Sequence, residues 1–388
     1  MKYFMQLWFI WIFNIYHQAV FGADLGYVRS TLTQHFSDTR HHVTNPAYKS
    51  RARQFIYDEF QKHGLDTNNH NFTFLGVSYT NVIGVLKGEK FGKYEDKIVG
   101  VGAHYDTVKI TKGVDDNGSG VTAMLESLRQ IAVGNQGGKR RNNTIIYMAF
   151  DHEEYDSLDN GLIGSKFAIE QWLMPWLTKN YGQHWETLKP HGIIVLDTVM
   201  NYNSSAQSQI IPPESEPLFQ AYFPKTVSSL KSDQFQGDFL AAIFRQNLDG
   251  NLASTFNSEW LGEPQPEFEI EKFGIDYQNV SDDTWNLFND FFRSDHVNFW
   301  KTNIPAIFIT DSANFRGQMQ QCYHNACDNL TNILTDNNVR FLGKTADTIA
   351  ATLDKLSEAY NTNPSSASCN GDFISILRIS IGLMLVMI

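Results

Sequence analysis

Three apolar, strand-like runs in this chain each end in side chains of the types that bind metals. Residues 98–103, 144–150 and 192–196 lead into His104 and Asp106, into Glu153 and Glu154, and into Asp197, respectively. In open α/β sheets the carboxyl ends of the strands border a common crevice. We therefore expect these strand ends to meet, although they are far apart in the sequence. A fourth run, over 304–309, leads to the loop that holds His324.

The rest of the pattern predicts an α/β domain. We expect a further strand over 80–86, and helices over 121–133 and 165–176, which separate the strands along the chain. Residues 25–64 have the three- and four-residue apolar spacing of an amphipathic lead-in helix, which Gly64 ends. Strands that alternate with helices predict a mostly parallel, mixed central sheet with helices on both faces.

The chain divides into a short leader, one large domain and a tail. Residues 1–22 are predicted to be a signal peptide, because their apolar run is too short to span a membrane. Residues 24–362 form the domain, within which 201–295 have a less regular pattern and form either a lobe or lid over the site or an inert insertion. The tail, 363–388, is either a lipid-anchor signal or a plain hydrophobic terminus.

The histidine at the end of the first run has a carboxylate two residues later. His104 and Asp106 point the same way, because side chains alternate along a strand. Asp106 is therefore expected to hold the imidazole or its surroundings, as carboxylates do for histidines that bind metals.

The next acidic residues favour a hydrolytic site with two metal ions. Asp116 lies in the glycine-rich loop 113–120, just before a predicted helix, and one carboxylate there can bridge two cations and offset their repulsion. The adjacent acids Glu153 and Glu154 can have two different roles. One of them can bind metal while the other takes a proton from the attacking water.

Together these motifs resemble the M28 family of zinc aminopeptidases. The resemblance rests, in order and spacing, on VGAHYDT at 101–107, GVDDNGSG at 113–120, the acids at 153–154 and GLIGS at 161–165. It implies a zinc-exopeptidase-like fold and an enzyme that removes N-terminal residues from peptides. The implied ligands are His104, Asp116 and Asp197 for one zinc ion and Asp116, Glu154 and His324 for a second, with Glu153 as the general base.

Two departures from the family pattern keep alternatives open. His324 keeps only the spacing to Asp328, so His296 is a rival ligand, while His152 is predicted to be no more than a neighbouring ring. Residues 155–160 form a longer connection that resembles the glutaminyl cyclases, which share the fold, use one zinc ion and cyclise an N-terminal glutamine. Carboxypeptidase activity and a catalytically inactive binding ectodomain are further alternatives.

Several features predict a secreted or cell-surface protein. Six Asn-x-Ser/Thr sequons are present, at Asn71, Asn117, Asn142, Asn203, Asn279 and Asn329. Asn117 lies too close to the predicted site to be glycosylated. Cys322 and Cys327 are expected to form a disulfide around His324, the alternative being two free thiols, and Cys369 is then left over.

The charge balance limits the possible partners. The chain has 31 Lys and Arg against 42 Asp and Glu, a formal net charge of -11. This acidic balance argues against binding to phosphate backbones, so nucleic acid is not an expected partner. The expected partners are peptide substrates, with a membrane reached only through the lipid anchor. The sequence does not predict the oligomeric state.

Overall fold

The computed structural model describes residues 22–155, 161–182, 188–276 and 288–362. Residues 1–21 of the predicted signal peptide and the tail over 363–388 lie outside the described residues, as do Cys369, Asn279 and most of the 155–160 connection. Within the described ranges, no helix combines the length and the apolar character needed to cross a bilayer.

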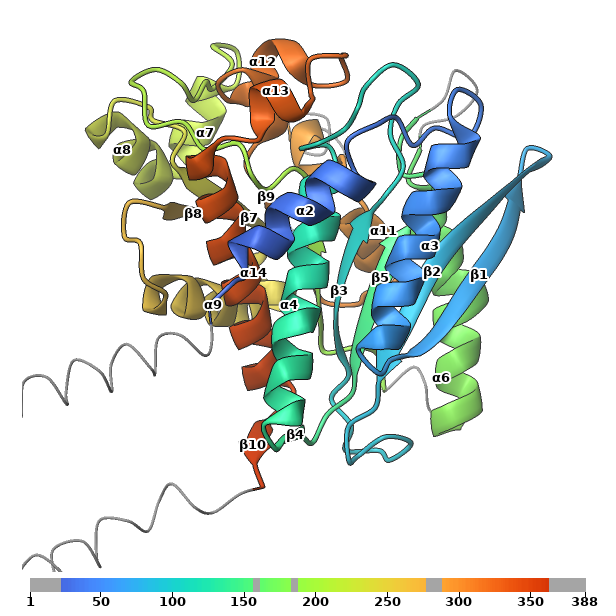
Figure 1. The fold of residues 1–388 in the computed structure, drawn as a ribbon. Coiled ribbons are helices and arrows are strands. Elements are labelled where there is room, and N and C mark those ends of the chain that lie inside the picture. Colours follow the sequence, from blue (N-terminus) through green and yellow to red (C-terminus); the bar gives the residue numbers. More distant parts are fainter. Residues whose placement is uncertain (1–21, 156–160, 183–187, 277–287, 363–388) are drawn as a thin grey trace, which may run out of the picture.

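An eight-stranded sheet lies at the centre of the described structure, in the order β1-β2-β5-β3-β6-β9-β7-β8 (Figure 1). The strands β5, β3, β6 and β9 run parallel, β1 and β2 add an antiparallel pair, and β7 pairs antiparallel with β9 and parallel with β8. The bounds are β1 Asp66–Phe74, β2 Val77–Leu86, β3 Val99–His104, β5 Ile145–Phe150, β6 Gly192–Leu196, β7 Phe239–Arg245, β8 Glu269–Ile275 and β9 Ala306–Thr310, with a separate pair β4 Lys139–Arg141 and β10 Ala359–Asn361.

Helices cover both faces of this sheet. One apolar core lies between the sheet and α2 (Leu25–His35), α3 (Pro46–Lys62), α4 (Gly118–Gln136), α9 (Gln246–Gly262) and α14 (Asp336–Leu356). A second core lies under η1 (Ala168–Leu173), α6 (Met174–Tyr181), α7 (Glu216–Tyr222), α8 (Pro224–Ser232), η4 (Asn289–Phe292) and α11 (His296–Lys301). The short helix α5 (Ile163–Phe167) precedes η1. The remaining short helices are η5 (Ala313–Phe315), α12 (Met319–Cys322) and α13 (Leu330–Ile333). The predicted mixed α/β fold with two covered faces is confirmed.

The four central strands are buried along their whole length. Every position of β3, β5, β6 and β9 is buried, as expected for parallel strands that helices cover on both faces. Their sequences are therefore continuous apolar runs and not alternating ones. Ala103 of β3 is in register with Ala149 of β5 and with Leu196 of β6. The residues that follow these three strands consequently start side by side.

The predicted single lead-in helix over 25–64 is wrong. The chain forms two helices, α2 and α3, and the connection between them contains Arg40. The Arg40 side chain is buried, and its guanidinium donates hydrogen bonds to the carbonyl oxygens of Tyr105 and Gly113. The break in the helix thus places a cation against the loops that follow β3.

The irregular segment 201–295 is in part an extension of the sheet. It contains β7, β8 and α9, and β7 pairs with β9 beside the central strands. β7 and β8 therefore belong to the central sheet, and both expectations for the rest of 201–295 stay predictions. Residues 277–287 of the segment lie outside the described residues.

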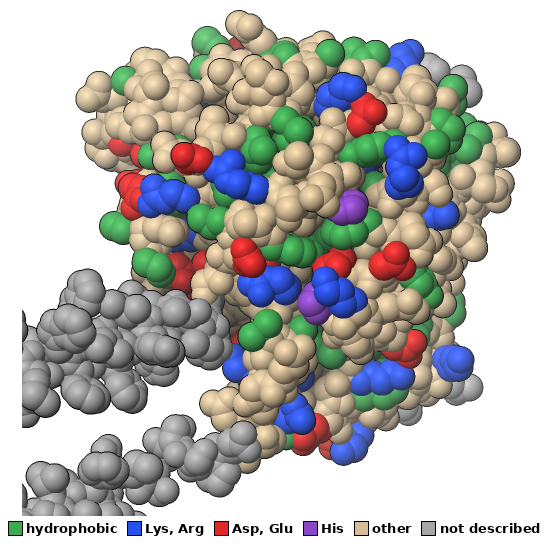
Figure 2. Space-filling view, in the orientation of Figure 1, with side chains coloured by type: hydrophobic (Ala, Val, Ile, Leu, Met, Phe, Trp, Pro, Cys, Tyr) green, Lys and Arg blue, Asp and Glu red, His purple; other side chains and the backbone are tan. Residues whose placement is uncertain are grey.

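The surface carries both signs of charge. On the face shown in Figure 2, Lys and Arg side chains are interspersed with Asp and Glu and with apolar side chains. A surface with mixed signs keeps an acidic protein soluble without creating a continuous basic stripe on this face.

A buried ion pair ties β7 to β9 and α11. Arg245 and Asp249 are almost fully buried, and Arg245 Nη2 lies 2.8 Å from Asp249 Oδ1. The guanidinium also donates to the carbonyl oxygen of Ile304, while Asp249 accepts from the backbone N–H of Ala306. Each charge is therefore satisfied by several partners.

Replacing Asp249 with Ala should destabilise the fold by about 3–5 kcal/mol, because it leaves a buried guanidinium without its counter-ion. The control is Glu267→Ala, which breaks the half-exposed Glu267–Arg340 pair and should cost less than about 1 kcal/mol. Urea unfolding followed by tryptophan fluorescence measures both free energies of unfolding. Equal losses in the two variants would contradict this account of Arg245.

Candidate metal centre

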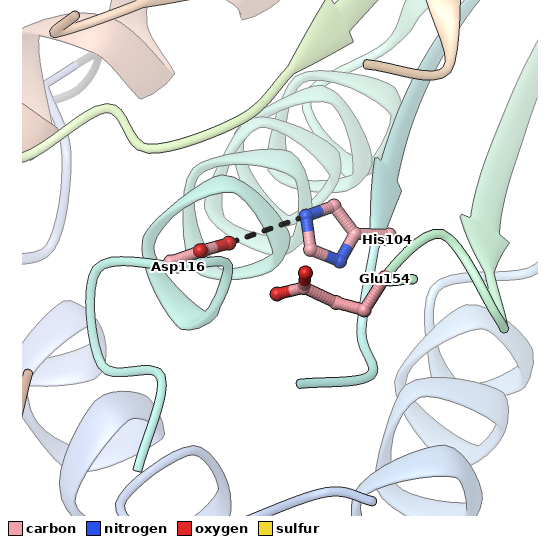
Figure 3. Close-up of side chains that lie close together, drawn as sticks. All are labelled: His104, Asp116 and Glu154. Atoms are coloured by element: carbon pink, nitrogen blue, oxygen red, sulfur yellow. Dashed lines mark ion pairs between the residues drawn. The ribbon is translucent and has the colours of Figure 1, made fainter. Parts of the chain in front are cut away.

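The strand ends meet, as the sequence predicted. His104 is the last residue of β3, Glu153 and Glu154 lie in the turn after β5, and Asp197 follows β6 directly. Asp116 reaches the same point from the loop before α4 (Figure 3). His324 comes from the loop that follows α12. The side chains lie in one cluster at the carboxyl edge of the sheet, in which His104, Asp116, Glu153 and Glu154 are buried and Asp197 and His324 are partly exposed.

Asp116 lies between the two histidines. Its Oδ1 is 3.4 Å from His104 Nε2, and its Oδ2 is 3.2 Å from His324 Nε2. Each histidine also faces another carboxylate: Asp197 Oδ1 is 3.4 Å from His104 Nε2, and Glu154 Oε2 is 3.2 Å from His324 Nε2. The arrangement thus has two halves that share Asp116.

Several buried atoms of this cluster have no hydrogen-bond partner among the residues that the structure describes. They are His104 Nδ1 and Nε2, Asp116 Oδ2, Glu154 Oε1 and His324 Nε2. Buried polar atoms are normally paired, and imidazole nitrogens and carboxylate oxygens are ligands of zinc. Ligand atoms of His104, Asp116 and Glu154 lie within 4.8 Å of one another, and so do those of His104, Glu153 and Asp197. The residues present therefore fit divalent cations.

Glu153 lies slightly farther from His104 than Asp116 and Asp197 do. Its Oε2 is 3.8 Å from His104 Nε2, compared with 3.4 Å for the nearest oxygens of Asp116 and Asp197. Glu153 is thus close enough to act on a group bound at the centre, although the geometry also leaves it within reach of a cation.

The electrostatics reflect an excess of buried acids. Burial alone would lower the pKa of His104, but the carboxylates of Glu153 and Asp197 outweigh it and raise that pKa. For His324, Glu154 and Asp116 overcome the same effect of burial and raise the pKa to about 11. The neighbouring carboxylates therefore stabilise the protonated form of both imidazoles.

The pKa values of the adjacent Glu153 and Glu154 are raised. Burial raises the pKa of Glu153, and the charges of Asp197 and Glu154 add to it against the opposing effect of His104. Burial and the charge of Asp116 raise the pKa of Glu154 to about 7. Cations at this position would offset the repulsion that these shifts express.

Asp106 supports the turn that carries the two glutamates. Its Oδ1 and Oδ2 accept hydrogen bonds of 3.2 Å from the backbone N–H groups of Glu153 and Glu154. Its Oδ1 also lies 3.4 Å from His104 Nδ1. Burial opposes ionisation of Asp106, but the neighbouring His104 lowers its pKa to about 2. A supporting role of Asp106 at the metal centre stays a prediction.

The loop before α4 is fixed from two sides. Asp328 accepts hydrogen bonds from the backbone N–H groups of Asp115 and Asp116, at 2.9 and 3.1 Å. Gly113 has a φ of +61°, and a Cβ there would lie 2.2 Å from the Asp116 carbonyl oxygen, so only glycine fits. Asn117 is fully buried, and its amide donates to the Leu196 carbonyl oxygen. Its sequon is therefore inaccessible in the folded chain.

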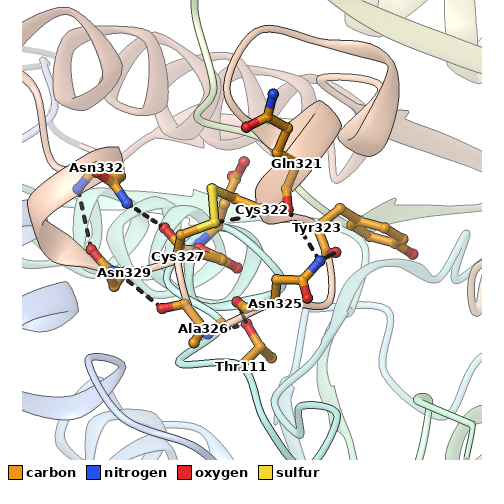
Figure 4. Close-up of a disulfide and its surroundings, with 12 residues drawn as sticks. Thr111, Gln321, Cys322, Tyr323, Asn325, Ala326, Cys327, Asn329 and Asn332 are labelled. Atoms are coloured by element: carbon orange, nitrogen blue, oxygen red, sulfur yellow. Dashed lines mark hydrogen bonds between the residues drawn. A yellow bond between two sulfur atoms is a disulfide. The ribbon is translucent and has the colours of Figure 1, made fainter.

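The loop that carries His324 is closed by the predicted disulfide. Cys322 and Cys327 are bonded (Figure 4), which confirms the pairing. Tyr323 stacks on His324 with ring centroids 3.9 Å apart, and Thr111 Oγ1 donates to the Asn325 carbonyl oxygen at 2.9 Å. These contacts hold the imidazole against the loop after β3.

The two other histidines that the sequence analysis considered, His296 and His152, lie outside the cluster. His296 is fully buried and stacked on Phe308, its Nε2 is 2.9 Å from the Phe291 carbonyl oxygen, and burial lowers its pKa to about 3. It is a core residue and not a ligand. His152 stacks on Tyr79 with ring centroids 4.2 Å apart, as expected for a neighbouring ring.

Asp295 was not assigned a role from the sequence, yet it lies close to the centre. It is fully buried, and neither carboxylate oxygen has a hydrogen-bond partner in the described part of the chain. Burial raises its pKa to about 7, with the charge of His104 opposing, and Asp295 in turn contributes to the raised pKa of Glu153. Asp295 directly precedes α11, and the sequence around it carries no pattern that marks this position.

Comparisons with known proteins place this fold among zinc-dependent exopeptidases and their relatives. The chain is 31% identical to aminopeptidase YwaD of Bacillus subtilis (strain 168) over 137 residues, which cover 33% of this chain and 28% of that protein. The structure resembles an aminopeptidase from Aneurinibacillus sp. strain AM-1 (TM-score 0.56, 12% identity, 86% of this chain and 94% of that one). It also resembles Porphyromonas gingivalis glutaminyl cyclase (TM-score 0.52, 17% identity, 87% and 99%). These two structural likenesses show a shared fold.

A family model covers most of the domain. The description of that family is Peptidase family M28, and the match spans residues 81–249 and 252–352. These ranges include both histidines and all the acids of the metal centre. The chain is accordingly a zinc metallopeptidase by class, and it belongs to peptidase family M28.

Proposed function

We propose that this chain is an aminopeptidase that uses two zinc ions to remove N-terminal residues from peptides. The observation that carries the proposal is the position of Asp116, whose two carboxylate oxygens face the imidazoles of His104 and His324. A carboxylate with one oxygen toward each half of a site is suited to bridge two cations.

Each half of the centre supplies a separate ligand set. His104, Asp116 and Asp197 would hold one zinc ion, and Asp116, Glu154 and His324 would hold the other. Each set combines one imidazole with two carboxylates, a combination that is common for catalytic zinc and leaves coordination positions open. Asp106 would act from outside this shell, because its oxygens hold the turn of Glu153 and Glu154.

The reaction requires a base beside the attacking water. Bound zinc supplies Lewis-acid polarisation of the scissile carbonyl group and lowers the pKa of water. Glu153 would take the proton from that water and then pass it to the leaving amine. Burial keeps the Glu153 carboxylate out of bulk solvent, so the proton stays at the site between the two steps. Asp106 keeps the carboxylate in place through its hydrogen bond to the Glu153 N–H.

Glutaminyl cyclase activity is the second candidate. The structural likeness to the Porphyromonas gingivalis enzyme, which covers 99% of that chain, supports it. The presence of a complete second ligand set, with Glu154 and His324 3.2 Å apart, favours the aminopeptidase. The number of bound zinc ions and the products separate the two candidates.

The variant Glu153→Gln should retain about two zinc ions per chain, as in the wild type, because Glu153 is not among the proposed ligands. Its kcat should fall by about 10²–10⁴-fold, since the amide cannot accept the proton. Zinc content is measured by elemental analysis and turnover with an aminoacyl amide. Glu95→Gln, on an exposed loop, is the matched control and should behave as wild type. Near-normal turnover in zinc-loaded Glu153→Gln would remove Glu153 from the mechanism.

A substrate panel tests the direction of cleavage. Peptides with a free α-amino group should be cleaved at least about 100-fold faster than the same peptides after N-acetylation, because an aminopeptidase recognises the terminal amine. Mass spectrometry of the products detects loss of one N-terminal residue. Formation of pyroglutamate from glutaminyl peptides, without hydrolysis, would establish the cyclase instead. Release of C-terminal residues would establish a carboxypeptidase.

We further propose that the enzyme acts outside the cell, attached to the surface by a lipid that replaces the tail 363–388. The Cys322–Cys327 disulfide supports a secretory route, because disulfides persist in oxidising compartments. The sequon at Asn71 is exposed and available for glycosylation. A phospholipase specific for glycolipid anchors should release the native protein from intact cells. Protein that stays on the cells after this treatment would exclude the anchor, and protein in the untreated medium would indicate simple secretion.

A further inference from the structure

A second group of acidic side chains lies at the starts of β7 and β8, the two strands at one edge of the sheet. Asp233 caps the end of α8, Asp238 directly precedes β7, and Glu269 is the first residue of β8. One carboxylate oxygen from each of the three lies within 4.8 Å of the other two. None of these residues belongs to the proposed zinc centre.

Backbone hydrogen bonds bring the three acids together. The Glu269 N–H donates to the Asp238 carbonyl oxygen at 2.9 Å, which aligns the starts of β7 and β8. The Phe235 N–H donates to Asp233 Oδ1 at 3.0 Å. Asp233 is partly exposed and Glu269 is exposed, so both carboxylates have room to turn away into solvent. They converge with Asp238 instead, although like charges repel.

Asp238 provides the independent sign of a ligand. The residue is only 8% exposed, and its Oδ1 is a buried atom without a hydrogen-bond partner among the described residues. Burial, together with the charges of Glu269 and Asp233, raises the pKa of Asp238 to about 6. A buried carboxylate oxygen that is left unpaired among other acids is costly unless a cation binds it.

The neighbouring Arg316 does not pair with the buried carboxylate of Asp238. Arg316 Nη1 donates to the carbonyl oxygens of Phe239 and Asn201, and its Nε donates to Gln209 Oε1. Its charge lowers the pKa of Asp238, but this effect is smaller than that of burial and the two acids. Among the described residues, Arg316 Nη2 has no hydrogen-bond partner, so the guanidinium does not form a hydrogen bond with Asp238.

We propose that Asp233, Asp238 and Glu269 form a binding site for Ca²⁺. The candidate ligands are all oxygen atoms, with no imidazole or thiolate, and hard cations prefer such a set. Ca²⁺ accepts six to eight oxygen ligands in flexible geometry, so water completes the shell on the exposed side of Glu269. Mg²⁺ is disfavoured because it demands a near-ideal octahedron and releases its water reluctantly.

The bound ion would join three elements that are separate in the sequence. It would link the end of α8 to the starts of β7 and β8, the two strands at one edge of the central sheet. Its expected effect is on the stability of this edge and not on the zinc-dependent chemistry. The proposal is therefore independent of the function proposed above.

Thermal unfolding of the zinc-loaded full chain tests the site. Adding CaCl₂ up to about 10 mM should raise the Tm by a few degrees, with a half-maximal effect at about 0.1–1 mM, the range of extracellular calcium modules. The same concentrations of MgCl₂ should have a clearly smaller effect. Asp238→Asn and Glu269→Gln should each raise the half-maximal CaCl₂ concentration at least about ten-fold, because each removes a charged ligand.

Matched variants separate this site from general salt effects and from the zinc centre. Asp58→Asn removes a charge from an exposed position on α3 and should leave the calcium response unchanged. Glu153→Gln should also keep it. An absent response up to 10 mM CaCl₂ would overturn the proposal, and so would an unchanged response in both Asp238→Asn and Glu269→Gln. If Asp238→Asn does not fold, the exposed Glu269→Gln variant decides the outcome.

Discussion

The excess of negative charge buried at the carboxyl ends of β3, β5 and β6 is the constraint on which the rest of the structure depends. Asp116, Glu153 and Glu154 are each at most 7% exposed, and with Asp197 they surround only two imidazoles. Charges of one sign are not stable at such a site without compensation. The fold provides the positions, through four buried parallel strands, and divalent cations would provide the compensating charge. The arrangement of acids at this sheet edge and the binding of zinc thus depend on each other, because the buried negative charges need compensation.

A further set of buried aspartates fixes the backbone at this edge of the sheet. Asp106 accepts the backbone N–H groups of two successive residues in the turn after β5, and Asp328 does the same for the loop before α4. Asp311 accepts the N–H groups of Met200 and Asn201 beyond β6. Each carboxylate fixes a segment that follows or carries a proposed ligand. The precision of the centre therefore comes from side chains that are not themselves ligands, as is general for metal sites.

The sequence predicted the parts of this protein that a continuous apolar run determines. The strands β3, β5, β6 and β9 are such runs, and the acids and the histidine that follow them met as expected. It did not predict β7 and β8, because Phe239–Arg245 and Glu269–Ile275 lie in a region with many aromatics and irregular spacing, where no alternation of strand and helix is visible. The split of the lead-in helix was also missed. That break depends on a tertiary contact, the burial of Arg40 against the Gly113 carbonyl oxygen, and local spacing carries no sign of it.

The second half of the proposed zinc centre depends on a covalent bond that the first half does not need. His104 and Asp197 are attached to β3 and β6, so their positions follow from the sheet. His324 lies on a loop outside the sheet, and its place opposite Asp116 depends on the Cys322–Cys327 bond and on the contact of Asn325 with Thr111. A reducing compartment would remove one of these restraints and loosen one imidazole only. In the proposed function, a zinc ion at Asp116, Glu154 and His324 would therefore depend on this disulfide, whereas an ion at His104, Asp116 and Asp197 would not.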